Sequence, residues 1–78
     1  MLLNIYSAFD RVSQSYSEPF TAVNDGVAVR RFNYVLSNSA MVAEDMQLFC
    51  LGTLNTDSGV IEPRQQFICN YTKPVAEA

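Results

Sequence analysis

The 78-residue sequence contains no histidine, only two cysteines and only three glycines. Without histidine, a single chain cannot build a histidine-based triad or a histidine acid–base pair. Cys50 and Cys69 alone cannot supply the roughly four Cys or His ligands that a zinc site needs. The glycines lie far apart, so the sequence has no glycine-rich phosphate loop. We therefore expect a binding protein that is not an enzyme and holds no metal or other cofactor.

Charge is scarce as well. Charged residues make up 17% of the chain and hydrophobic residues 49%, and the net charge is −3. This charge content is low for the surface of an exposed monomer, so we expect a second copy to cover part of it in a homodimer. The acidic balance argues against a protein that coats duplex nucleic acid through charge alone, although a local basic groove would still attract phosphate.

Long hydrophobic runs are absent too. The opening MLLNIYSAFD lacks the basic leader and long apolar core of a signal peptide. No apolar run approaches the roughly 20 residues that span a bilayer. We expect no contact with a membrane, and a reducing cytoplasm in which both thiols stay free.

One domain is expected over residues 1–72, followed by a frayed tail at 73–78. The clearest local signal is a helix over Val27–Leu36, preceded by the capping residues Asn24 and Asp25. Apolar residues recur there at helical spacing and define the expected buried face. They are Ala28, Phe32, Val35 and Leu36.

The remaining apolar segments predict strands, which are Leu2–Phe9, Phe20–Val23, Met46–Leu54, a short return at Val60 and Ile61, and Gln65–Asn70. Asp10–Pro19 is expected to be a loop or an irregular hairpin tip, and Asn55–Gly59 a turn. Pro63 should interrupt its strand or place it at an edge. The predicted fold class is α+β, an antiparallel sheet of three to four strands with one helix packed on a face.

Two strands carry informative patterns. In Leu2–Phe9, alternate residues form one apolar face and one mixed face, as in a sheet with a single covered side. Leu3, Ile5 and Phe9 share the apolar face, and Asn4, Tyr6 and Ala8 share the mixed one. Met46–Leu54 is apolar on both faces, which predicts a central strand covered on both sides.

The first candidate site lies on the helix. Arg30, Arg31 and Tyr34 are three or four residues apart, so their side chains should project together. Arginine binds phosphate in a fixed fork, and tyrosine offers a stacking face to an unpaired base. The alternative is a solvated helix face on which an arginine lies against the tyrosine ring.

A second set lies in or beside loops, where binding residues concentrate. Arg11, Tyr16 and Arg64 could extend a stacking surface that binds single-stranded nucleic acid. As scattered exposed residues they equally need no function.

Three segments together resemble the small nonstructural protein of gokushovirus-type microviruses, which are single-stranded DNA phages. They are LLNIYSAFD at the start, PFTAVNDGVAVRRF from Pro19 to Phe32, and LFCLGTLNTDSGVIE from Leu48 to Glu62. The resemblance covers most of residues 2–62. It implies an accessory DNA-binding protein of phage replication or packaging in the host bacterial cytoplasm. It carries over no catalytic motif.

Two functions therefore remain open. One is a homodimeric module that binds single-stranded DNA. The other is a non-catalytic interaction module that binds a phage or host replication protein, which the low charge and nine aromatic residues would suit. An exposed sheet edge would allow dimerisation by sheet extension, and Gln65–Asn70 is the expected edge.

Overall fold

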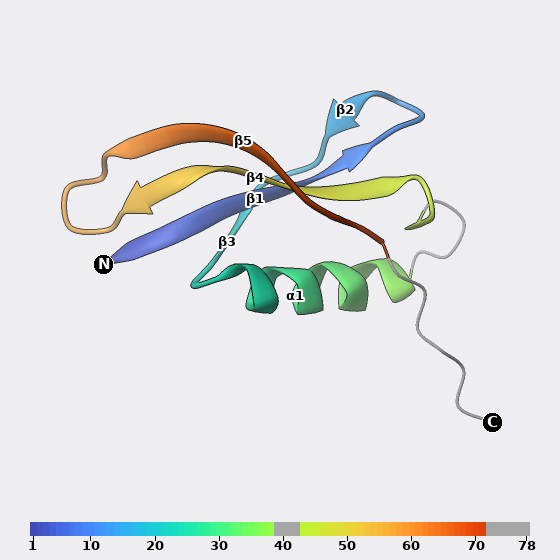
Figure 1. Ribbon diagram of the computed structural model, residues 1–78, viewed down its shortest axis with the longest axis horizontal. Coiled ribbons are helices and arrows are strands. Elements are labelled where there is room, and N and C mark those ends of the chain that lie inside the picture. Colours follow the sequence, from blue (N-terminus) through green and yellow to red (C-terminus); the bar gives the residue numbers. More distant parts are fainter. Residues whose placement is uncertain (39–42, 72–78) are drawn as a thin grey trace.

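The computed structural model describes residues 1–38 and 43–71. Within them the chain forms an antiparallel sheet with one helix packed against it, which confirms the α+β class (Figure 1). The expected tail at 73–78 lies outside the described residues. The elements, in chain order, are β1 (Leu2–Asp10), β2 (Ser15–Tyr16), β3 (Phe20–Ala22), α1 (Asp25–Ser37), β4 (Met46–Asn55) and β5 (Ile61–Asn70).

The sheet has five strands rather than three or four, because two short segments both pair with β1. The path across it is β2-β1-β4-β5, and β3 lies beside β2 along the same edge of β1. Part of the expected loop Asp10–Pro19 thus becomes a strand, in which Tyr16 pairs with Phe9. All pairings are antiparallel, and β4 is central between β1 and β5.

The hairpin between β4 and β5 forms around the expected turn. The Asn55 side-chain oxygen accepts hydrogen bonds from the backbone N–H groups of Asp57 and Ser58, and Gly59 adopts a positive φ of 76°. β5 continues through Pro63 as an edge strand, where a missing N–H is tolerated. Cys50 lies opposite Gln66 and not Cys69, and both cysteines are free.

Helix α1 begins where the capping residues predict. The Asn24 side-chain oxygen accepts a hydrogen bond from the Val27 backbone N–H at 2.9 Å. Ala28, Phe32 and Leu36 face the sheet and are buried, as expected. Val35 was expected on the same face but is 54% exposed, because at about 100° per residue it lies at the margin of the arc that these three residues define. No helix in residues 1–38 and 43–71 is long and apolar enough to cross a membrane.

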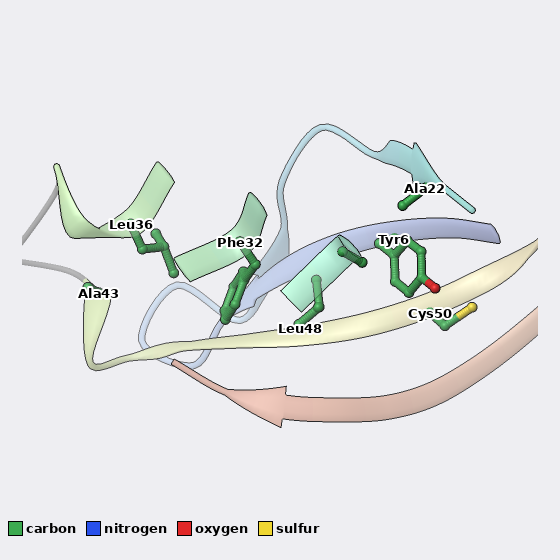
Figure 2. Packing of buried hydrophobic residues seen from close by; sticks show 8 residues of the cluster. Tyr6, Ala22, Phe32, Leu36, Ala43, Leu48 and Cys50 are labelled. Carbon is green, nitrogen blue, oxygen red and sulfur yellow. The ribbon is translucent and has the colours of Figure 1, made fainter. Parts of the chain in front are cut away.

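The core lies between α1 and one face of the sheet (Figure 2). Its largest fully buried side chains are Tyr6, Leu48 and Cys50, from the two neighbouring strands β1 and β4. Tyr6 stacks on Phe20 with 5.7 Å between the ring centroids. Its hydroxyl accepts a hydrogen bond from the Asn4 amide and donates one of 2.6 Å to the Asp25 carboxylate.

This arrangement places the mixed face of β1 against the helix and leaves its apolar face uncovered by α1. In this arrangement the hydroxyl of the buried Tyr6 is hydrogen-bonded to Asn4 and to Asp25 of the first helical turn. The prediction that β4 is covered on both sides is wrong within this chain. Only the side of β4 that carries Leu48 and Cys50 meets the helix layer (Figure 2).

Tyr6 also gives the fold a pH dependence at the alkaline end. Burial and the hydrogen bond to Asp25 raise the pKa of Tyr6 from 10.0 to about 12. Below pH 10 the neutral phenol stabilises the fold fully. Above it the unfolded chain ionises first, so stability falls as the pH approaches 12. Urea unfolding at pH 9 and pH 11 should show this fall in the wild type. The Tyr6→Phe variant should show a smaller one, and equal losses in both proteins would contradict the assignment.

Candidate functional site

The open face, meaning the side of the sheet away from α1, carries a four-ring cluster formed by Phe9, Tyr16, Phe49 and Phe67. The rings come from β1, β2, β4 and β5, so the cluster crosses the sheet from one edge to the other. Phe49 lies at its centre, with ring centroids 5.9 Å from Phe9, 5.7 Å from Tyr16 and 5.7 Å from Phe67. Phe9 and Tyr16 are 4.8 Å apart.

The rings are held by local pairing. Tyr16 is the cross-strand partner of Phe9, and Phe49 is the partner of Phe67. The Gln65 side-chain N–H donates a hydrogen bond of 2.8 Å to the Tyr16 hydroxyl, which ties β5 to β2 over the intervening strands. These contacts hold the four rings together in the absence of a ligand.

The cluster is only partly shielded from solvent. Tyr16 is 40% exposed and Phe67 is 47% exposed, while Phe9 and Phe49 are half-buried among their neighbours. Rings packed edge-to-face leave some of their π surface accessible. Such a surface can stack on flat aromatic groups or accept apolar side chains.

The surroundings of the cluster are uncharged. Because side chains alternate between the two faces of a strand, register assigns ten further positions of β1, β4 and β5 to the open face. They are Leu3, Ile5, Ser7, Gln47, Leu54, Ile61, Pro63, Gln65, Asn70 and, at the irregularity in β4, Leu51. None of these is acidic or basic. The acidic balance of the chain therefore does not apply to this face.

The predicted site residues of the helix lie on α1, on the opposite side of the sheet from the four-ring cluster. Arg30 and Tyr34 are exposed on α1, Tyr34 at 71%. Arg31 lies 5.0 Å above the Phe20 ring and not on Tyr34. It also lines a hollow of about 470 Å³ between α1 and the segment that leads into β3. These residues share a helix face but form no joint site with the four-ring cluster.

Of the loop set, only Tyr16 joins the cluster. The Arg11 guanidinium donates a 2.9 Å hydrogen bond to the Glu44 backbone carbonyl, at the end of β1 that carries Phe9. Arg64 lies on β5 next to Gln65 but lines a different hollow of about 250 Å³, together with Leu2 and Glu62. The six predicted residues are thus divided among the helix, the open face and the sheet ends.

Sequence reasoning missed Phe9, Phe49 and Phe67, because aromatic residues in strands usually belong to the core. The signal that could have found them is register. A regular hairpin around Asn55–Gly59 already sets Phe49 near position 66, and an irregularity in pairing shifts it to Phe67. No group of three or more acidic or Cys side chains in the described residues could hold a metal ion.

Comparison with known proteins gives one match. The model of the family described as Phage ORF5 protein matches residues 3–73. No curated protein and no solved structure matches the chain. Since the match covers all of the described sheet except its first residue, together with the helix, this chain belongs to the Phage ORF5 protein family.

Proposed function

We propose that this phage protein binds single-stranded DNA through the four-ring cluster on its open face, as a non-catalytic accessory protein of genome replication or packaging. The observation that supports this most is the presence of four neighbouring, partly exposed rings on a sheet face where β1, β4 and β5 place no charged side chain. Proteins that bind single strands without strong sequence preference use aromatic side chains on which successive bases stack.

The same arrangement disfavours duplex binding. A duplex keeps its bases stacked inside and presents phosphates, which an uncharged face cannot neutralise. Unpaired bases expose their π faces and can meet the rings directly. Arg11 lies at the end of β1 that carries Phe9, where it could contact a phosphate of a strand that crosses the cluster. The resemblance to microvirus DNA-binding proteins agrees with this role and with action in the host bacterial cytoplasm.

The first test is fluorescence anisotropy with a labelled oligo(dT), at two salt concentrations and with a duplex control. We expect preference for the single strand. We also expect a shallow salt dependence, with a log–log slope of roughly −1 to −2, because few phosphates are neutralised. Absence of binding at low salt would contradict the proposal.

Matched variants locate the site. Phe67→Ala and Tyr16→Ala should each weaken binding about 5- to 150-fold, since stacking contributes about 1–3 kcal/mol per base. Tyr34→Ala removes a still more exposed ring from the helix and serves as the control, together with the Arg30→Ala/Arg31→Ala double variant. If the helix variants lose binding and the sheet variants keep it, the site is on α1 instead.

A second candidate function is a module that binds a phage or host replication protein. It is favoured by the lack of charge on the open face, because the centres of protein interfaces are depleted in charged residues and enriched in aromatic ones. Under this alternative, a pull-down should recover one protein after nuclease treatment, and Phe67→Ala should abolish its capture. Oligonucleotide binding should then be absent.

A further inference from the structure

The outer edge of β5 is a long stretch of unpaired backbone. Within residues 1–38 and 43–71, β5 pairs with β4 on one side and with no strand on the other. It is ten residues long, and the seven residues from Ile61 to Phe67 are all exposed. An edge of this kind presents a row of N–H and C=O groups that can pair with another strand.

The two halves of this edge differ in how they are protected. The first half contains Glu62, Pro63 and Arg64, and charged residues and proline are the usual means of blocking edge pairing. The second half, Gln65–Asn70, has no charged residue and no proline. The second half lacks both of these features, although it contains the bulge at Ile68, so it is the half that can accept a partner strand.

We propose that Gln65–Asn70 pairs antiparallel with the same segment of a second copy of this chain, so that the four-ring clusters of both copies form one continuous binding surface. The part that concerns nucleic acid rests on the function proposed above. An identical segment suits this edge because a two-fold axis makes the surface its own partner. Since the segment is uncharged, two copies that each carry a net charge of −3 meet where neither brings charge.

Pairing of the two β5 strands brings the four-ring clusters of the two copies together. A two-fold axis perpendicular to the sheet keeps both open faces on one side and both helices on the other. Adjacent strands lie about 4.8 Å apart, so the two β5 strands become neighbours within a single sheet. Phe67 lies inside the pairing segment, and its ring is therefore close to the junction in both copies. Each copy thus contributes rings to a site that one copy only half completes.

The size of the contact sets its strength. Six residues paired at an edge bury less than the roughly 1,200 Å² that stable interfaces need, so the free dimer should be weak. A single strand long enough to reach both clusters would hold the two copies together, because each half then binds at the high effective concentration created by the other.

The test uses the full chain in sedimentation velocity over a 10-fold or wider range of concentration. Gln66 is the position to change, since it is exposed and faces away from the four-ring cluster. We expect the wild type to dimerise as concentration rises and both Gln66→Glu and Gln66→Lys to dimerise at least 10-fold more weakly. An equal mixture of the two variants should dimerise more strongly than either variant alone, because attraction between unlike charges then replaces the repulsion between like charges.

Val12→Glu places the same charge on a 75% exposed loop residue and should leave dimerisation unchanged. Circular dichroism confirms that the variants fold. A wild type that stays monomeric at every concentration, with and without oligo(dT), overturns the proposal. So does a Gln66→Glu variant that dimerises as the wild type does.

An oligo(dT) length series separates this inference from the proposed function. Affinity should rise sharply at the length that reaches the second cluster, and Gln66→Glu should remove that rise while keeping the affinity for short oligonucleotides. Dimerisation without any oligonucleotide binding would contradict the proposed function but support the β5–β5 pairing. Binding to a monomer at all oligonucleotide lengths, with no rise in affinity, would contradict the pairing but support the proposed function.

Discussion

Tyr6→Ala is expected to lower the free energy of unfolding by about 3–5 kcal/mol, the usual cost of removing a large buried ring. Tyr6 is fully buried, stacks on Phe20, and links β1 to the first turn of α1 through Asp25. A chain of 78 residues has a net stability near the lower end of the usual range of about 5–15 kcal/mol. The variant should therefore be largely unfolded, which urea titration followed by circular dichroism will show.

Tyr6→Phe separates the ring from its hydroxyl. It keeps the packing and loses the hydrogen bonds to Asn4 and Asp25, at a cost of about 1.5 kcal/mol for a bond to a charged group. Asp25 is exposed and can be solvated again, so the loss should stay at that lower value. A Tyr6→Ala variant that unfolds at nearly the wild-type urea concentration would show that the ring is not buried between sheet and helix.

Gly52→Ala is expected to cost about 2–3 kcal/mol, at the upper end of the range for overpacking. Gly52 lies at the irregularity of the central strand β4, opposite Pro63. A Cβ added there would lie 2.5 Å from the backbone carbonyl oxygen of Glu62, closer than any real contact. Because the clashing atom belongs to the backbone, β5 itself must move for the variant to fold.

Gly26→Ala is the matched control for this substitution. Gly26 lies in the first turn of α1. A Cβ added to it would lie 3.4 Å from the Asn24 side-chain oxygen, which is an ordinary van der Waals distance. Alanine is preferred there, so the variant should be unchanged or more stable by up to about 1 kcal/mol. If both alanine variants unfold alike in urea, β5 does not approach β4 as closely as the structure has it.

Local patterns were enough to predict most of the elements. Asn24 and the apolar spacing after it predict α1, and the turn residues Asn55–Gly59 predict the hairpin. These features depend on residues close together in the chain, where capping and turn chemistry act. The class of fold follows from their order, and the structure confirms it.

What failed was the assignment of faces. An apolar row such as Leu3, Ile5 and Phe9 normally marks the covered side of a strand, yet here the helix covers the side that carries Tyr6. That arrangement includes a contact between residues 19 positions apart, the Tyr6–Asp25 hydrogen bond. A single sequence does not reveal such a pair in advance.

The candidate site was missed for a related reason. Its four rings come from four strands, and they meet only once the register of each pairing is set. Irregularities in β1–β4 and β4–β5 shift that register by a residue, which reverses the face on which a side chain lies. Tyr16 was identified because its segment was predicted to be a loop, where binding residues concentrate. The three phenylalanines lie in predicted strands and were therefore interpreted as core residues.

The two short strands β2 and β3 limit how many copies of the chain can assemble by pairing of sheet edges. Both lie on the outer edge of β1, so β5 alone offers a long unpaired edge among the described residues. Pairing of β5 with β5 uses up that edge in both copies, and assembly by strand addition closes at two.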